Sequence, residues 1–362
     1  MGSSWRNIPG AFADGAILFP ILAALSMSTD LGPARLLVST GVAYLAAALV
    51  FRIPMPIQPL KSVAIAAIAL GASGTEVRVA GALVGLVCIA LLLANPNEMA
   101  GKIPISLIHG VQMALGFLLV LKGMSFLGRS LPPVTNIAVL VLIAGILIGA
   151  EMSWFPLLGV MGLSGMVLGL MGGSEVVPEV AHSPHFRWEV LAALVLPQLV
   201  LTLSNSVVAT HEVAKRYYGK RAERATPYNL LASIGAGNVI SAAIGGLPFC
   251  HGSGGLTAHY RAGSTHWISN VVIGLTILAL AWGYGNAFQL VFPVPLLAAL
   301  LVSVGIFHAR LAAPSWAERH SRLVVVTMGL TAVLTQNMLW VMIAGVAVKA
   351  LQNVLGLAVR TK

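Results

Sequence analysis

Three prolines interrupt an apolar stretch of this chain, which reads Pro54-Met-Pro-Ile-Gln-Pro-Leu-Lys-Ser62. Each proline lacks a backbone N–H and pushes the residue before it towards an extended conformation, so a continuous helix cannot pass through the stretch. Pro59 suits the first position of a new helix. The N–H groups of Leu60, Lys61 and Ser62 would then lack helical partners and point towards the middle of the span.

A second interrupted stretch lies near residue 250 and reads Gly246-Leu-Pro-Phe-Cys-His-Gly-Ser-Gly-Gly-Leu256. Its glycines Gly252, Gly254 and Gly255 let the backbone come close to a ligand. Ser253 is a candidate helix N-cap. We therefore expect each stretch to be a short extended piece followed by a helix, with the two helix N-termini facing one another across one small space.

The composition around these stretches is that of a membrane protein. Of the 362 residues, 58% are hydrophobic and 9% are charged, whereas a soluble domain carries roughly 25% charged residues. Apolar blocks such as Leu36–Phe51 and Val79–Ala94 have about the length that a helix needs to cross a bilayer. The net charge of +10 comes from basic residues in the loops between blocks, so we assign it to membrane topology and expect no nucleic-acid partner.

The apolar pattern predicts an all-α polytopic fold with about fourteen transmembrane segments in two inverted repeats of seven. The first repeat (1–171) contains segments at 11–28, 34–52, 54–71, 76–95, 104–122, 134–150 and 155–171; an extracytoplasmic connector (172–188) follows; the second repeat (189–362) contains segments at 189–212, 228–244, 248–262, 265–284, 288–308, 321–335 and 337–352. The interrupted stretches fall in segments 3 and 10, at corresponding positions. Paired interrupted segments in an inverted repeat indicate the binding site of a transporter.

The distribution of basic residues predicts the orientation of the chain. With the N-terminus in the cytoplasm, 15 of the 21 Lys and Arg residues fall inside and 5 outside, with Lys61 left within a span. This bias predicts a multi-pass protein of the cell (inner) membrane with both termini in the cytoplasm.

The chemistry of the two helix N-termini favours an anion. Such ends carry partial positive charge and free donors, and Lys61 adds a full positive charge. Asp14 is the only acidic residue placed well inside a span, and we expect it to pair with Lys61. The alternatives are that the prolines only kink a helix, that Lys61 snorkels or is purely structural, and that His251 and Asn205 serve packing between helices.

Other classes of function find little support in the sequence. No G-x-x-x-x-G-K-[ST] loop is present, which excludes ATP-driven transport within the chain, and no enzymatic constellation is found. His182 and His185 lie in the polar connector, and we expect neither a metal site nor a cofactor. The two cysteines, Cys88 and Cys250, imply no disulfide framework.

Four stretches carry a family resemblance. Pro54–Ser62 resembles a signature of the molybdate transporter family, which is related to the SulP sulfate permeases, and Leu247–Arg261 resembles the second signature of that family. Gly10–Ile21 and Leu196–Ser206 also fit, and all four occur in the expected order. One departure is Ala-Asp-Gly-Ala-Ile at 13–17, where Gly-Asp-Leu-Gly-Thr is more typical, so a threonine hydroxyl is missing near Ile17.

The resemblance implies a core of segments 1–4 and 8–11 that carries the substrate, and a gate of segments 5–7 and 12–14 that often forms the contact of a homodimer. It also places the substrate between segments 3 and 10. Carried over to this chain, the substrate-binding residues would be Gln58, Pro59, Leu60, Lys61, Ser62, Asn205, Cys250, His251, Gly252, Ser253, Gly254 and Gly255. Asp14 and His251 are the candidates for proton coupling.

These observations predict a secondary transporter that imports a tetrahedral oxyanion by alternating access. Molybdate is the first choice because of the signatures, sulfate is the second, and tungstate shares the same chemistry. Proton symport would offset the cost of moving a dianion against a negative-inside potential, about 2.3 kcal/mol per charge per 100 mV. The alternatives are a sulfate permease of the same fold, a nucleobase-type carrier and an anion channel.

Overall fold

The computed structural model describes residues 7–93, 103–127, 145, 185–285 and 294–355, and these residues are almost entirely helical. The α-helices are α1 (Asn7–Gly10), α2 (Gly15–Ser28), α3 (Pro33–Phe51), α4 (Lys61–Leu70), α5 (Gly74–Leu91), α7 (Ile105–Leu127), α10 (Trp188–Leu201), α11 (Thr210–Tyr218), α12 (Pro227–Ile244), α13 (Ser253–Arg261), α14 (Ile268–Tyr284), α15 (Val294–Arg310), α16 (Arg319–Thr335) and α17 (Met338–Val354). A π-helix, η2 (Thr202–Ala209), two 3₁₀ turns, η3 (Gly219–Ala222) and η5 (Ala313–Trp316), and two strands, β1 (Gln58–Pro59) and β2 (Phe249–Cys250), complete the described elements.

The all-α architecture predicted from the sequence is confirmed, with a short extended piece before a short helix in segments 3 and 10. The segments predicted at 134–150 and 155–171, and most of the connector, lie outside the described residues. Among the described helices, four are long and apolar enough to cross a membrane: Pro33–Phe51, Gly74–Leu91, Ile105–Ser125 and the continuous helix Trp188–Ala222. Shorter apolar helices accompany them, as expected where spans are broken.

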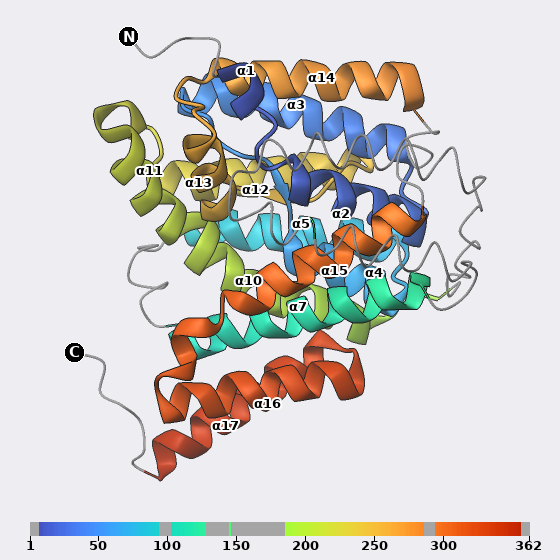
Figure 1. Cartoon of the computed structure of the whole chain (residues 1–362), viewed down its shortest axis with the longest axis vertical. Helices are drawn as coiled ribbons and strands as arrows, with labels where there is room; N and C mark the ends of the chain where they lie inside the picture. Colours follow the sequence, from blue (N-terminus) through green and yellow to red (C-terminus); the bar gives the residue numbers. More distant parts are fainter. Residues whose placement is uncertain (1–6, 94–102, 128–144, 146–184, 286–293, 356–362) are drawn as a thin grey trace.

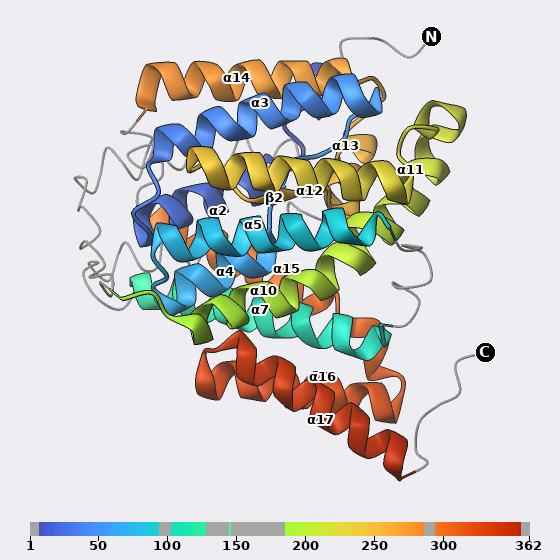
Figure 2. The same cartoon turned by 180° about the vertical axis from the view of Figure 1, so that it is seen from behind.

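The helices lie alongside one another in layers (Figure 1), from α14 and α3 at the top of the view to α16 and α17 at the bottom. Helix α3 packs on α14, and α5 packs on α12 (Figure 2). In the predicted numbering, α3 and α14 are segments 2 and 11, and α5 and α12 are segments 4 and 9. A pseudo-twofold axis between two inverted repeats would exchange one pair with the other.

The outer surface of the helices is apolar. Leu49 on α3 is 71% exposed, Trp282 on α14 is 94% exposed and Leu334 on α16 is 82% exposed. Soluble monomers rarely expose large contiguous apolar patches. Helices that are hydrophobic all round are typical of membrane spans.

The breaks before α4 and α13 follow from local chemistry. Helix α3 ends where Arg52 adopts a left-handed conformation with φ of 55°, and the prolines then prevent the helix from continuing. Two expected details are wrong. Pro59 lies in β1, and helix α4 begins at Lys61; Ser253 is the first residue of α13, with Gly252 in the cap position.

Candidate functional site

The two broken segments meet as a short antiparallel ribbon in the protein interior. Gln58 faces Cys250 and Pro59 faces Phe249, and the N–H of Leu60 donates to the carbonyl of Pro248 at 2.9 Å. Because each strand leads directly into a helix, the ribbon holds the N-termini of α4 and α13 beside one another.

Helix α12 supports the ribbon through one side chain. The amide of Asn238 accepts a hydrogen bond from the N–H of Phe249 at 2.9 Å and donates to its carbonyl at 2.7 Å. It thereby replaces the neighbouring strand that β2 lacks on this edge. Extended backbone at membrane depth requires such partners, because water is not there to supply them.

The N-terminus of α4 is partly capped by the protein. The N–H of Ser62 donates to Gln198 Oε1 at 2.9 Å, and Gln198 Nε2 donates to Thr202 Oγ1 at 3.0 Å. The expectation of three free N–H groups is therefore wrong for Leu60 and Ser62, whose N–H groups bond to distant parts of the chain. The hydroxyl of Ser62 is buried and has no hydrogen-bond partner.

Lys61 lies at the start of α4 without the predicted acidic partner. Asp14 interacts with it electrostatically, but within the described residues no carboxylate forms an ion pair with Lys61. The expected Asp14–Lys61 pair is thus wrong, because Tyr44 and His259 approach the Asp14 carboxylate instead. The positive charge of Lys61 is left for another partner.

The amide of Gln58 lies against the N-terminus of α13. Both Oε1 and Nε2 are buried without hydrogen-bond partners. A Cβ at Gly252 would collide with Oε1, and a Cβ at Gly255 would collide with Nε2. Glycine is therefore required at both positions for this approach, whereas Gly254 borders open space.

The π-helix η2 contributes Asn205 from segment 8. Its Oδ1 accepts a hydrogen bond from Ser253 Oγ at 2.6 Å, and its carbonyl accepts from Thr210 Oγ1 at 2.9 Å. The Cys250 thiol donates to the carbonyl of Pro59 at 3.9 Å, and Ser206 of the same π-helix interacts with it. Hydrophobic periodicity did not predict this π-helix, although π-helical turns are frequent at functional sites.

The side chain of His251 is held away from Ser253. Its Nδ1 bonds to the carbonyl of Pro56 at 3.0 Å, and its Nε2 bonds to Ser233 Oγ at 2.9 Å. The ring also meets the Phe51 ring edge-on, with centroids 4.9 Å apart. Both ring nitrogens are thus occupied, one by the segment before β1 and the other by α12, while the ring packs against the end of α3.

The structure adds His308 of α15 to the surroundings of Lys61. His308 is buried, its Nδ1 bonds to the carbonyl of Val304 at 3.0 Å, and its Nε2 has no hydrogen-bond partner. It interacts electrostatically with Lys61. The sequence pattern gave no signal for His308, because this residue stands alone in an apolar segment far from both signatures.

A second missed residue is His259, which reaches Asp14 from α13. His259 Nε2 lies 3.3 Å from Asp14 Oδ1, and both side chains are fully buried. The Tyr44 hydroxyl is 3.1 Å from each carboxylate oxygen, and His259 Nδ1 bonds to the carbonyl of Gly10 at 2.9 Å. His259 lies within the second signature, so its position in the sequence was a usable signal.

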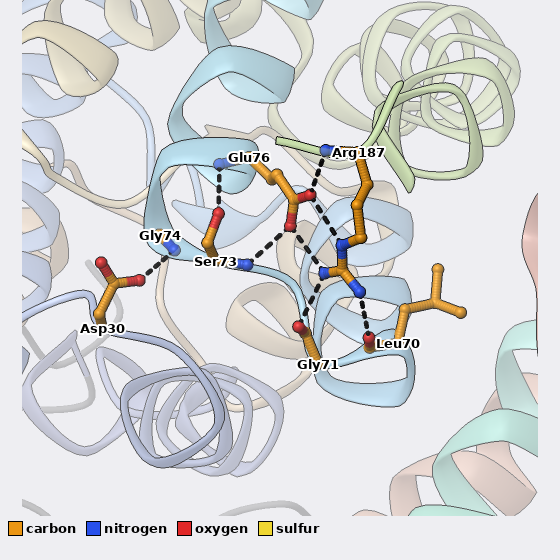
Figure 3. A network of polar contacts seen from close by, with 7 residues as sticks. All are labelled: Asp30, Leu70, Gly71, Ser73, Gly74, Glu76 and Arg187. Carbon is orange, nitrogen blue, oxygen red and sulfur yellow. Dashed lines mark hydrogen bonds and ion pairs between the residues drawn. The ribbon is translucent and has the colours of Figure 1, made fainter. Parts of the chain in front are cut away.

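A further network, centred on Glu76 and Arg187, ties down the other end of α4 (Figure 3). Arg187 lies 2.8 Å from Glu76 Oε2 and donates to the carbonyls of Leu70 and Gly71. Glu76 also forms a capping box with Ser73 at the start of α5. Hydrogen bonding to Glu76 raises the pKa of Arg187 above its ordinary value. The network joins α4, α5 and α10, and so fixes the helix that carries Lys61.

Comparison with known proteins relates the chain to molybdate transporters. The model of the family "Molybdate transporter of MFS superfamily" matches residues 6–119 and 190–307. "Molybdate transporter 2" of Arabidopsis thaliana is 23% identical over 360 residues, which cover 83% of this chain and 77% of the relative.

Two solved structures are similar in fold. The transmembrane domain of a cyanobacterial bicarbonate transporter, BicA, superposes with a TM-score of 0.70 at 18% identity and covers 96% of this chain and 98% of its own. The murine anion transporter Slc26a9 in its inward-facing state gives a TM-score of 0.71 at 13% identity and covers 100% of this chain and 70% of its own. At these identities the likeness concerns the fold.

Proposed function

The chain belongs to the molybdate transporter family, and from this premise we propose that it is a secondary transporter that imports molybdate across a membrane. The substrate lies between the N-termini of α4 and α13. It is a tetrahedral dianion, so tungstate and sulfate are its closest chemical competitors.

One observation carries this proposal: three donors beside the ribbon, on Gln58, Lys61 and Ser62, lack partners in the described part of the chain. Gln58 Nε2 and the Ser62 hydroxyl are buried and unsatisfied, and Lys61 has no ion pair within the described residues. A buried polar group without a partner costs about 1–3 kcal/mol. A dianion that accepts these hydrogen bonds would remove that cost, and Lys61 would balance half of its charge.

The remaining predicted residues take different parts in this proposal. Ser253 presents its hydroxyl beside Asn205 at the first turn of α13, while Gly252 and Gly255 make room for Gln58. The backbone of the ribbon, including Cys250, fixes these groups. His251 supports the ribbon and does not reach the anion, since both of its ring nitrogens are already bonded.

Transport would proceed by alternating access between a core and a gate. The core comprises segments 1–4 and 8–11, and the gate comprises segments 5–7 and 12–14, which also form the homodimer contact. Helix α15 of the gate packs on α2 and α7 and brings His308 towards Lys61. Movement of the core past this helix would expose the anion to one side and then to the other.

The proposed location is the cell membrane with both termini in the cytoplasm. The basic residues Lys215, Arg216, Lys220 and Arg221 cluster on α11 and η3, and α17 ends on the side to which α11 projects (Figure 1). Basic clusters of this kind remain on the cytoplasmic side of a bilayer.

Binding to the purified protein tests the substrate assignment. Calorimetry would compare molybdate, tungstate, sulfate, bicarbonate and uracil on the wild type, on Lys61→Ala and on Ser253→Leu. We expect molybdate and tungstate to bind most tightly and to lose at least about tenfold in affinity in both variants, because a hydrogen bond to a charged group contributes roughly 1.5–3 kcal/mol. Lys349→Ala, on the partly exposed helix α17, is the matched lysine control.

The alternatives predict different results in the same experiment. Tight sulfate binding with weak molybdate binding would make the protein a sulfate permease on this scaffold. Binding of uracil alone would refute the anion site. A channel would be recognised in liposomes, because it cannot accumulate molybdate against its gradient.

A further inference from the structure

The Asp14–His259 pair lies deep in the protein and outside the proposed anion contacts. It joins the start of α2 to α13, with 3.3 Å between His259 Nε2 and Asp14 Oδ1. The Tyr44 hydroxyl, from α3, is the other polar group on the carboxylate. His259 Nδ1 is held by the carbonyl of Gly10, which aims Nε2 at the acid.

Few charged groups surround this pair among the described residues. On the elements packed around it, the titratable groups nearest the interior are Tyr44 on α3, Lys61 on α4, Cys250 on β2, Tyr218 on α11 and His308 on α15. The other titratable side chains of α3, α11, α13 and α15 are exposed or partly exposed, namely Arg35, His211, Glu212, Lys215, Arg216, Tyr217, Tyr260, Arg261 and Arg310. Lys61 interacts electrostatically with Asp14. Because Lys61 also faces the proposed anion site, the charge on the pair and the charge on the substrate influence one another.

We propose that the Asp14–His259 pair binds the proton that is transported with the anion, an inference that rests on the proposed function. Without the proton, a carboxylate and a neutral imidazole leave one net negative charge buried. With it, the pair is neutral overall, whichever partner holds the proton. The proton enters from water on the outer side and is released to water on the inner side.

The position of the pair couples it to the substrate. Ser253 and His259 lie on the same short helix, six residues apart, which is about 9 Å along its axis at 1.5 Å per residue. At an effective dielectric constant of about 20, a unit charge roughly 10 Å away changes a proton's binding constant by about tenfold. A bound dianion therefore favours protonation of the pair, and protonation favours anion binding.

The other candidate for the proton is excluded by its contacts. His251 has both ring nitrogens bonded, to Pro56 and Ser233. Protonation would require Ser233 Oγ to act only as an acceptor and would bury a full charge between two phenylalanine rings. The Asp14–His259 pair meets neither obstacle, since the carboxylate neutralises an added proton.

Reconstitution into liposomes tests the inference. An acid-outside pH gradient should drive accumulation of molybdate by the wild type, and Asp14→Asn and His259→Gln should each reduce this accumulation at least tenfold. Both variants should still bind molybdate in detergent and exchange it at equal pH. Glu212→Gln is the matched control, because Glu212 is an exposed acid that lies 3.9 Å from His211. This variant should accumulate molybdate as the wild type does.

A milder variant keeps the test decisive if the first two do not fold. Tyr44→Phe keeps the shape of the side chain and removes a donor to the carboxylate, so the proton should bind more readily. The pH at which accumulation is half-maximal should move upward.

Three results would overturn the inference while leaving the proposed function intact: proton-driven accumulation retained by Asp14→Asn and His259→Gln, no pH shift in Tyr44→Phe, or wild-type transport that ignores the pH gradient. Absence of molybdate binding and exchange by the wild type would instead refute the proposed function itself.

Discussion

Two pairs of acid and base, each with a buried carboxylate, occupy different parts of this protein and differ in their surroundings. The Arg187 side chain is 26% exposed, whereas Asp14 and His259 are fully buried. The Glu76 carboxylate accepts hydrogen bonds from the N–H of Ser73 and from the backbone N–H, Nε and a terminal nitrogen of Arg187. The Asp14 carboxylate has one hydroxyl, that of Tyr44, and the His259 ring 3.3 Å away. The Glu76 carboxylate thus accepts four hydrogen bonds, whereas the Asp14 carboxylate has few hydrogen-bond donors.

The difference separates structural pairs from pairs that can change charge. Arginine does not lose its proton in proteins, whereas histidine gains and loses one near neutral pH. The Glu76–Arg187 pair therefore holds one charge state and fastens three helices at the end of α4 (Figure 3). The Asp14–His259 pair can exist in two charge states, which is a requirement for carrying a proton.

The largest loss of stability is expected when the Glu76–Arg187 pair is removed. Arg187→Ala removes the main donor of the Glu76 carboxylate; because the Arg187 side chain is 26% exposed, we expect a cost of about 1.5–3 kcal/mol, the contribution of hydrogen bonds to a charged group. We expect a large drop in the thermal unfolding temperature in detergent. Molybdate affinity per folded molecule should change little. If Arg187→Ala unfolded at the wild-type temperature, the Glu76–Arg187 network would not stabilise the fold.

A smaller loss of stability is expected when the Asp14–His259 pair is altered. In Asp14→Asn the amide oxygen can still accept from Tyr44, and no charge is left unpaired, so we expect a cost of about 1 kcal/mol. The thermal unfolding temperatures of Asp14→Asn and Arg187→Ala, measured in the same detergent, compare the two pairs directly. Equal destabilisation by the two variants would break the distinction drawn between the pairs.

The capping box at the start of α5 tests whether the Glu76–Arg187 pair depends on its neighbour Ser73. Ser73→Ala removes the acceptor of the Glu76 N–H at the start of α5, and loss of such a cap costs about 1 kcal/mol. Thr226→Ala, which removes the N-cap of α12, is the matched control at a helix without an ion pair. A clearly larger effect at Ser73 would indicate that the cap and the Arg187 pair stabilise one another.

The smallest effect is expected at the exposed pair of His211 and Glu212. The Glu212 side chain is 68% exposed and lies 3.9 Å from the imidazole. Surface pairs contribute little, with a median of about 0–1 kcal/mol. Glu212→Gln should leave the unfolding temperature within experimental error, and a marked destabilisation would contradict the ranking by burial.

Much of the fold could be predicted from local chemistry. The prolines between Arg52 and Leu60 place the break in segment 3, and apolar block lengths place the helices. The glycines of segment 10 were expected to let the backbone approach a ligand, which stays a prediction; in the structure Gly252 and Gly255 lie against the Gln58 side chain. These features depend on residues near one another in the chain, which is why composition and spacing reveal them.

The partners of the polar side chains could not be predicted in this way. Asp14 was expected to pair with Lys61 but lies with Tyr44 and His259, the second of them on α13 in the C-terminal half of the chain. The cap on Ser62 comes from Gln198, 136 residues away. Hydrogen-bond partners at such separations depend on how helices are placed in space, which a linear pattern does not specify.

The sequence by itself determined that the chain is a bundle of apolar helices broken before α4 and before α13, because proline, glycine and hydrophobicity act through the local backbone. Only the tertiary structure decided which donors stay without partners and which acid meets which base. Gln58 is unsatisfied and Gln198 is bonded, although both are buried glutamines beside a proline. The difference lies in what the packing of distant segments brings within about 3 Å of each amide.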